Sequence, residues 1–490
     1  MSAVSVVATP VPLLAGNTTA LVMGGTFHPL TGPRDSPAYV TGYLDNAVHR
    51  HLDPAFGTPI TNAVAVVTPQ EFFPIGRRTL DRSVAEGRVI LHTCLATPPN
   101  CAVNTDAGVL PRAGSVAPHP GDAFRVFGYS QSAVIASLVK SDLIRTFQPG
   151  DPSVAFMLIA NPMRPNGGIL MRLLGWPTIP ILGVSFPGAS PTDSARLDDG
   201  SWAFPTVDVV RQYDGLGGDF PVRPLNLIAL VNALMGYGLL HGETVDVPFA
   251  RARHQGQVGD TSYRLIATDI VPLLQPFAFF VPKPILAAVD APLRVLIEDA
   301  YERGVSPGTP TRADWRPIKN LAKLAVDLIA AIPVAVDNLI EGFGLPRVLG
   351  TDRPGPFGVG GPALPDEPAP TESALPATEP VAPQAIRVSD GGGAGDPEPD
   401  AADPVPAGDA DITGNADDPG ASGDEVAVTD VTDDAGITEA DGADAAEEPG
   451  VAQPDDEADE AEGADDADAR ADPESAPAPA RDAEDAAAAA

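Results

Sequence analysis

The 490-residue sequence has little cysteine, few aromatic residues and no long uncharged apolar run. Its two cysteines are too few for a structural zinc site, and we expect neither a metal nor a cofactor. The nearest candidate for a membrane span, residues 321–340, contains Lys323, Asp327 and Asp337, which are costly in hydrocarbon. No transmembrane span is therefore expected. The chain also lacks a basic stripe that could contact phosphates, which argues against a nucleic-acid partner.

Negative charge is concentrated at one end of the chain. Residues 361–490 hold 37 Asp and Glu against 3 Arg, which gives −34 of the net −36, and they contain no Lys, aromatic residue or Cys. The first 360 residues are close to neutral, with 29 acidic and 27 basic side chains. A segment of this composition cannot bury enough apolar surface to offset roughly 1–2 kcal/mol of backbone entropy per residue. We therefore expect a disordered acidic tail, rich in Ala, Asp, Glu and Pro, over residues 351–490, without chemistry of its own.

The two cysteines, Cys94 and Cys101, lie seven positions apart and flank two prolines. This spacing favours a short disulfide loop near a surface turn, with two free thiols as the alternative. A disulfide indicates an oxidising compartment, so we expect a secreted or cell-envelope protein. Residues 1–16 are apolar but lack a basic start and a convincing signal-peptide core, which leaves a cytoplasmic location open.

Short apolar strands alternate with helical segments along the first half of the chain. The strands are expected at Thr19–Met23, Ala63–Val67, Ala123–Phe127, Val154–Ala160 and Val207–Gln212, with helices at Ser83–Thr93, Ala133–Phe147 and Leu225–Leu234. This alternation predicts an α/β fold whose central, mainly parallel sheet is covered on both faces. Function in such sheets gathers at the carboxyl ends of the strands.

The third expected strand runs into Gly128-Tyr129-Ser130-Gln131-Ser132, and a helix follows. A strand, a Gly-x-Ser-x-small sequence and a helix, in this order, form the sharp turn that exposes a nucleophilic serine. Ser130 is the candidate here. The N–H of Gln131 at the helix start and that of Thr26, after the Gly24-Gly25 turn, are the candidate oxyanion donors. An ordinary strand-to-helix turn capped by Ser130 or Ser132 is the structural alternative.

A serine nucleophile needs a base and an acid, which follow it in this fold in the order acid, then histidine. Only His241 and His254 follow Ser130, and His254 lies in what we interpret as a polar surface loop, so His241 is the candidate base. Two acids compete, Asp214 at the end of the fifth strand and Asp219 before Phe220-Pro221. We favour Asp219, the position where this fold commonly carries its acid, with Asp214 as the alternative.

From about residue 19 to residue 274, the chain resembles the PE-PPE C-terminal domain, a cutinase-like serine α/β-hydrolase of mycobacteria and related actinobacteria. The motifs that carry the resemblance are Gly24-Gly25-Thr26, Thr68-Pro69, Ser83-Val84-Ala85-x-Gly87, Gly128-Tyr129-Ser130-Gln131-Ser132-Ala133, Asn161-Pro162-x-Arg164-Pro165, Gln212-Tyr213-Asp214-Gly215, Asp219-Phe220-Pro221, and Asn232-Ala233-Leu234 before His241. The family domain usually follows an N-terminal PE or PPE domain, and we expect none before the match here. We expect a lead-in over residues 1–18, the hydrolase domain over 19–300, and a helical extension that packs on it over 301–350.

The resemblance implies an esterase that acts on acyl-ester or lipid substrates through an acyl-serine. An acyltransferase on envelope glycolipids and a catalytically silent envelope interaction protein are the alternatives. Three segments bear on the substrate: 168–188 as an insertion near the pocket mouth, 265–289 as a lid, an acyl-binding wall or ordinary core, and 318–343 as amphipathic helices on the domain or on a membrane surface. Peripheral membrane or envelope association is therefore a further expectation.

Overall fold

The computed structural model describes residues 17–106, 108, 109 and 117–366. The predicted lead-in up to residue 16 and the acidic tail from residue 367 onward lie outside the described residues.

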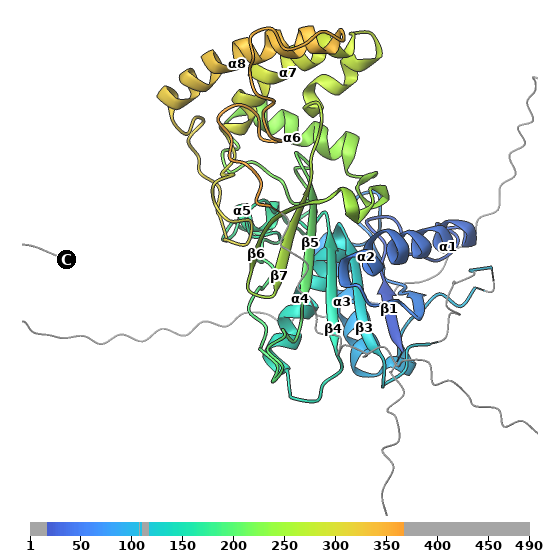
Figure 1. Cartoon of the computed structure of the whole chain (residues 1–490). Helices are drawn as coiled ribbons and strands as arrows, with labels where there is room; N and C mark the ends of the chain where they lie inside the picture. The colour runs from blue at the N-terminus through green and yellow to red at the C-terminus, as the bar shows by residue number, and fades with distance from the viewer. Residues whose placement is uncertain (1–16, 107, 110–116, 367–490) are drawn as a thin grey trace, which may run out of the picture. The chain divides into compact units, whose positions relative to one another are not determined.

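Seven strands form one sheet in the order β2-β1-β3-β4-β5-β7-β6 (Figure 1). The strands are β1 (Thr18–Val22), β2 (Asn62–Ala65), β3 (Ala123–Tyr129), β4 (Val154–Ile159), β5 (Thr206–Arg211), β6 (Arg253–Val258) and β7 (Thr261–Ile266). All neighbours pair in parallel except β6, which runs antiparallel to β7 at the edge. The predicted α/β fold with a mainly parallel sheet is confirmed, and each expected strand lies within two residues of its predicted bounds.

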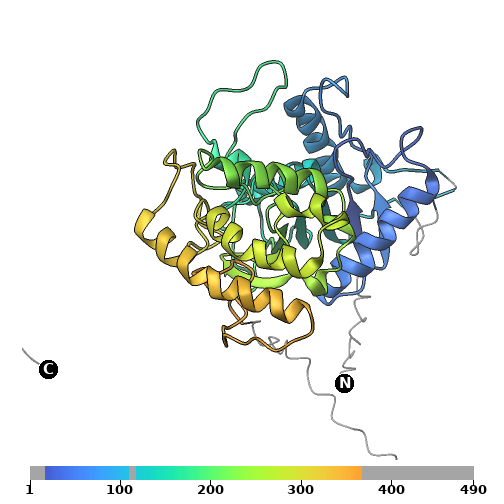
Figure 2. The ribbon, with the colours of Figure 1, turned by 90° about the horizontal axis from the view of Figure 1, so that it is seen from above.

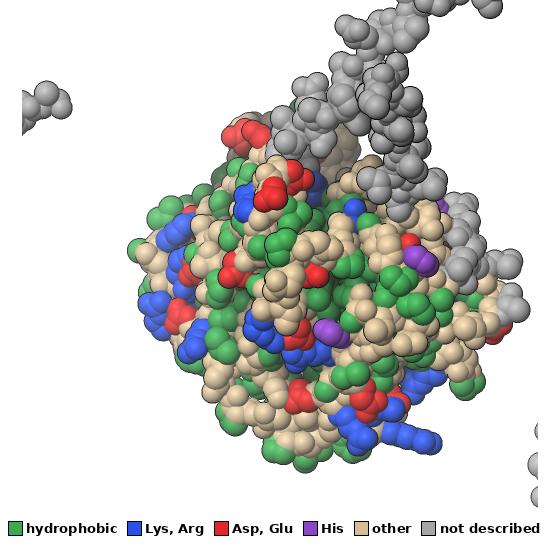
Figure 3. Space-filling model, turned by 90° about the horizontal axis from the view of Figure 1, so that it is seen from below, with side chains coloured by type: hydrophobic (Ala, Val, Ile, Leu, Met, Phe, Trp, Pro, Cys, Tyr) green, Lys and Arg blue, Asp and Glu red, His purple; other side chains and the backbone are tan. Residues whose placement is uncertain are grey.

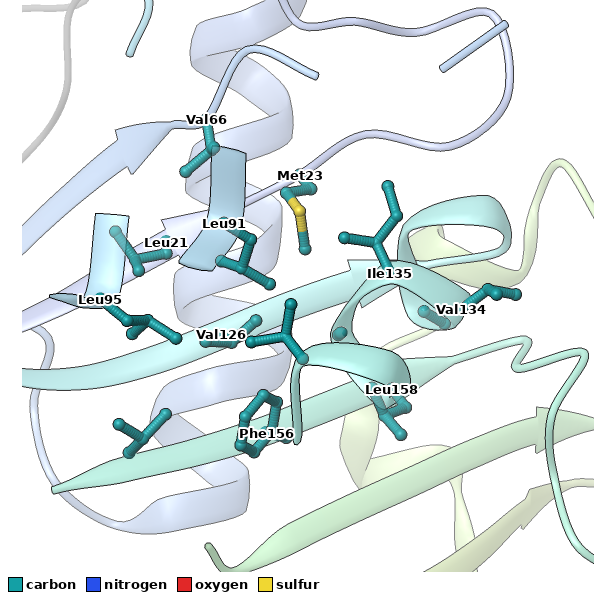
Figure 4. Packing of buried hydrophobic residues seen from close by; sticks show 14 of the residues in the cluster. Leu21, Met23, Val66, Leu91, Leu95, Val126, Val134, Ile135, Phe156 and Leu158 are labelled. Atoms are coloured by element: carbon teal, nitrogen blue, oxygen red, sulfur yellow. The ribbon is translucent and has the colours of Figure 1, made fainter. Parts of the chain in front are cut away.

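The helices follow the strands in the chain as the periodicity predicts. They are α1 (Pro37–Asn46), α2 (Asp53–Phe56), α3 (Leu80–Ala96), α4 (Gln131–Thr146), α5 (Ile169–Arg172), α6 (Leu227–Leu240), α7 (Lys283–Glu298) and α8 (Leu321–Gly342), with a π-helix η1 (Ala47–Leu52) and 3-10 turns η2 (Pro98–Asn100), η3 (Thr244–Asp246), η4 (Phe249–Arg251) and η5 (Pro272–Phe279). The strand period of two divides the central strands between two cores. Leu21, Val126 and Phe156 face one core, which α3 and α4 cover with Leu91 and Ile135 (Figure 4).

The neighbouring residues of the same strands face the opposite side. Ala20, Phe127 and Met157 pack there against Tyr43 of α1 and Val48 of η1. Two apolar faces on one sheet are what a parallel sheet covered on both sides requires. On the first side, Cys94 near the end of α3 forms a disulfide with Cys101, as the spacing predicted.

The chain after residue 300 stays on the folded body. Helix α8, within the expected extension over residues 301–350, packs against α7 through Leu324 and Ala331. The prediction that residues 351–366 belong to the tail is wrong. Phe357 is buried against Val210 and Leu265 of the sheet, so the folded part continues beyond residue 350.

Seen from above, α6, α7 and α8 form a layer on the upper part of the molecule, beyond the sheet (Figures 1 and 2). On the face seen from below, Lys, Arg, Asp and Glu side chains are scattered among apolar ones (Figure 3).

Candidate active site

Ser130 lies on a strained turn between β3 and α4. Its backbone has φ 58° and ψ −116°, a region that residues other than glycine rarely adopt. The turn requires a small residue two positions before the serine, because a Cβ on Gly128 would lie 2.7 Å from the carbonyl oxygen of Ser132. The Tyr129 N–H donates a hydrogen bond of 2.8 Å to the Ser132 hydroxyl. The turn thus holds the Ser130 hydroxyl at the carboxyl end of the sheet, as the motif predicts.

His241 lies between Ser130 and an acidic side chain. Its Nε2 is 2.8 Å from Ser130 Oγ, and its Nδ1 is 2.7 Å from Asp214 Oδ2. A carboxylate can only accept, so the Nδ1–H donates to Asp214 and Nε2 is left to accept from the serine hydroxyl. The predicted base, His241, is in place. The structure corrects the favoured acid, because Asp214 and not Asp219 touches the imidazole.

Asp219 has another partner. Its carboxylate accepts hydrogen bonds from the Arg303 guanidinium at 2.6 and 3.0 Å, and from the Tyr213 N–H at 2.7 Å. The chain reverses between the two acids, since the Asp219 N–H donates to the Asp214 carbonyl oxygen at 2.9 Å. Asp219 therefore braces the turn that presents Asp214. Arg303, 84 positions along the chain, is the partner that spacing alone could not reveal.

The turn at Asp214 is shaped by glycine. The Gly217 N–H donates to Asp214 Oδ1 at 3.0 Å, and a Cβ at Gly217 would lie 2.1 Å from Asp214 Oδ2. Helix α6 approaches the same turn closely, because a Cβ on Gly236 would lie 2.0 Å from the Tyr213 carbonyl oxygen. Tyr213 itself has φ 70°. These contacts fix the separation between the acid and the end of α6, where His241 lies.

The imidazole is held from several sides. His241 is the C-terminal cap of α6, where the negative end of the helix dipole favours a positive imidazolium. The Tyr129 ring stacks on the imidazole with centroids 5.2 Å apart, and its hydroxyl donates to the His241 carbonyl oxygen at 2.5 Å. The Tyr237 ring lies 4.6 Å away. Sequence analysis did not assign either tyrosine, although Tyr129 stands inside the serine motif.

Burial controls the ionisation of the acid. Asp214 is fully buried, and loss of water contact raises the pKa of its carboxyl group. The adjacent His241 and the Gly217 N–H oppose that rise, while the nearby Asp219 adds to it. The acid therefore takes up a proton at a higher pH than an exposed aspartate does.

The candidate oxyanion residues come together beside Ser130. Gln131 is buried, and its amide donates to Thr26 Oγ1 at 3.3 Å and to the Glu71 carbonyl oxygen at 3.1 Å. The Ser83 hydroxyl donates to Gln131 Oε1 at 2.7 Å. The predicted juxtaposition of Thr26 and Gln131 is therefore present, and their role as oxyanion donors stays a prediction.

A largely apolar cavity of about 830 Å³ opens onto Ser130 and His241. Tyr39 and Tyr43 of α1 contribute to its wall, and the segment 168–188 contributes Ile169, Ile179 and Phe186 among others, as expected of an insertion near the pocket. The segment 265–289 does not line this cavity, so its reading as an acyl-binding wall is wrong. The prediction that His254 lies in a surface loop is also wrong, because this residue is buried in β6.

Over the described ranges, no cluster of three or more His, Cys, Asp or Glu side chains could hold a metal ion. No helix of the described part is both long enough and apolar enough to span a bilayer.

The sheet, the strained serine after β3, the acid after β5 and the later histidine together define an α/β-hydrolase fold. Residues 59–302 match the family model of the PE-PPE domain, which confirms the predicted resemblance to this family.

Several curated relatives come from Mycobacterium tuberculosis. Uncharacterized PPE family protein PPE42 is 33% identical over 354 residues, covering 69% of this chain and 54% of the relative. Esterase PE16 is 33% identical over 318 residues, covering 62% of this chain and 52% of the relative. SL1278 acyltransferase Chp1 is 25% identical over 325 residues, covering 64% and 71%. The chain thus spans about half the length of the first two relatives, and no solved structure matches it.

Proposed function

We propose that the protein is a serine hydrolase that cleaves carboxylic acyl esters through an acyl-serine intermediate. The observation that carries this proposal is the unbroken chain of hydrogen bonds from Ser130 through His241 to Asp214, at 2.8 and 2.7 Å. The similarity to a relative named as an esterase supports the same reaction class. The disulfide fits an oxidising compartment, so we also propose a secreted or cell-envelope location.

The first step forms the acyl-enzyme. Ser130 Oγ attacks the ester carbonyl carbon while His241 Nε2 takes the hydroxyl proton, and Asp214 stabilises the imidazolium. The negative charge on the former carbonyl oxygen is placed at the N–H groups of Thr26 and Gln131. Collapse of this intermediate breaks the ester C–O bond, and His241 returns the proton to the leaving alcohol.

The second step regenerates the serine. His241 takes a proton from an acceptor hydroxyl, whose oxygen attacks the acyl carbon. The bond between this carbon and Ser130 Oγ then breaks, and His241 returns the proton to Ser130 Oγ. Water as the acceptor gives an ester hydrolase, and an alcohol gives an acyltransferase. The similarity to a relative named as an acyltransferase supports acyl transfer as a second candidate function, which uses the same three side chains.

A fluorophosphonate probe tests the proposal directly, because it reacts covalently with an activated serine. We expect labelling of the full chain and none of the Ser130→Ala variant, with p-nitrophenyl ester hydrolysis lost in parallel. Ser141→Ala, on the same helix α4 but away from the turn, is the matched control, with folding of both variants verified by circular dichroism. A folded chain that neither reacts with the probe nor cleaves esters would instead be a silent envelope protein. Adding an alcohol acceptor and measuring ester product against free acid separates acyltransferase from hydrolase.

A further inference from the structure

An apolar stripe on α6 leads across the protein surface to the active site. Leu227, Val231, Leu234 and Tyr237 are spaced at helical intervals of three or four residues, and each is exposed to solvent. The same spacing continues to His241 at the end of the helix. Tyr237 also lines the cavity that holds Ser130, so the exposed stripe is continuous with the pocket wall.

A cluster of phenylalanines projects from η5, the element that packs against α6. Phe277, Phe279 and Phe280 are 46%, 96% and 69% exposed at the end of η5, in a segment without charged residues. They are held in a defined shape, because the Phe280 N–H donates to the Phe277 carbonyl oxygen at 3.1 Å and their rings meet edge to face. We name these three residues the aromatic tip.

The tip is attached to the helix that carries the stripe. The Leu273 N–H of η5 donates to Asn232 of α6 at 3.1 Å, and the two elements pack together. Helix α8, in the same layer (Figure 2), also exposes Ile329 and Ile332 to solvent. Apolar side chains are therefore exposed on several elements of the layer that carries His241.

We infer that the α6 stripe and the aromatic tip dock on a lipid surface, from which the acyl ester enters the pocket; this inference rests on the proposed function. Large exposed apolar patches mark interaction sites, and aromatic rings are favoured at the boundary between lipid and water. A lipid surface fits better than a protein partner because the stripe ends at the pocket wall, where an acyl ester must arrive. The first 360 residues are near neutral, with 27 basic and 29 acidic side chains, so the contact is driven by apolar burial and not by anionic headgroups.

Vesicle binding by the catalytically inert full chain tests the inference without depending on turnover. The Ser130→Ala chain is mixed with phosphatidylcholine vesicles, floated on a density gradient and quantified in the lipid fraction. We expect binding that changes little between low and high salt. The Phe279→Ser, Phe280→Ser double variant should lower the partition coefficient about tenfold or more, because it removes two exposed aromatic side chains. Val231→Ser should lower it less.

Ile75→Ser and Val89→Ser are matched controls, since these apolar side chains are 73% and 67% exposed on other elements. Both should bind vesicles as the unmodified chain does. A second readout compares ester embedded in vesicles with a soluble short-chain ester, and the tip variant should lower the ratio of the two rates. Absence of vesicle binding, or equal losses in the control variants, overturns the inference.

Two further outcomes would also overturn it. Binding that disappears in high salt would show an electrostatic contact with headgroups. A concentration-dependent dimer that the tip variant abolishes, measured by light scattering, would identify a second copy of the chain as the occupant. Failure of the proposed function shows up separately, as a Ser130 that does not react with the fluorophosphonate probe while vesicle binding persists.

Discussion

Replacing Asp214 and Asp219 in turn by asparagine tests which of the two is the acid that assists His241 and which one stabilises the turn. Asp214→Asn keeps the shape of the side chain but removes the negative charge that faces His241 Nδ1 at 2.7 Å. An amide in place of such a carboxylate favours the wrong imidazole tautomer, which lowers kcat by about 10⁴-fold in a serine protease. We expect a fall in kcat/KM of about 10³- to 10⁴-fold, or about 4–5.5 kcal/mol of transition-state stabilisation.

The free energy of unfolding of Asp214→Asn should not fall together with its activity. Because burial raises the pKa of Asp214 in the folded state, the native protein binds this proton more tightly than the unfolded chain does. This group therefore favours folding most at low pH, below its unfolded pKa, and that contribution is lost as the pH rises through the folded pKa. At neutral pH the amide removes a buried charge, so Asp214→Asn should leave the free energy of unfolding unchanged or raise it.

Asp219→Asn is the matched comparison. It leaves Arg303 buried with only Glu298 as a carboxylate partner, and breaking one half of a buried ion pair costs about 3 kcal/mol or more. The amide oxygen can still accept from the Tyr213 N–H, so activity per probe-reactive site should fall less than about tenfold. Urea unfolding at constant m-value measures stability, and fluorophosphonate titration counts active sites. If Asp219→Asn were inactive at full labelling while Asp214→Asn stayed active, the assignment of the acid would be refuted.

Four other expectations follow from the same structure. Because burial raises the pKa of Asp214, the unmodified chain should gain free energy of unfolding relative to Asp214→Asn as the pH falls through the folded pKa of this group, and a difference that does not change with pH in urea titrations would contradict it. Gly236→Val should separate His241 from Asp214, because the new side chain would clash with the Tyr213 carbonyl oxygen. Ester hydrolysis should fall at least tenfold, and Gly238→Val, whose side chain would contact nothing, is the control. Phe357→Ala should lower the free energy of unfolding by about 3 kcal/mol or more in urea titrations, although it lies beyond the predicted body, and a change below 1 kcal/mol would mean that residues 351–366 contribute little. In a p-nitrophenyl ester series, kcat/KM should rise by up to fourfold per methylene over short to medium chains and then level off, whereas activity on peptides alone would remove the ester proposal.

Much of the fold could be predicted because its signals are local. The central strands are short runs of mostly apolar, buried residues, and α4 repeats apolar residues at helical spacing, so local patterns located these elements. Ser130 could be found for a related reason, since its turn imposes small residues at fixed positions around it. His241 followed by elimination, as only two histidines come after the serine.

The parts that failed depend on partners distant in sequence. Asp214 and Asp219 stand in the same short loop, and the choice between them is made by Arg303, whose approach no local pattern encodes. His254 has polar neighbours in sequence, yet its strand pairs with β7 and buries it. Phe357 lies within a proline- and glycine-rich stretch that resembles a tail, and it is ordered by contacts with Val210 and Leu265.

The sheet order has a consequence for how the site can change over evolution. Ser130 follows β3 and Asp214 follows β5, with β4 between them, so the distance that the imidazole bridges derives from two strand spacings of about 4.8 Å each. That width is common to parallel sheets, and the glycine turn at Asp214 then sets the final contact with His241. Insertions such as segment 168–188 can therefore remodel the cavity wall, and with it the choice of substrate, while the reacting groups keep their separation.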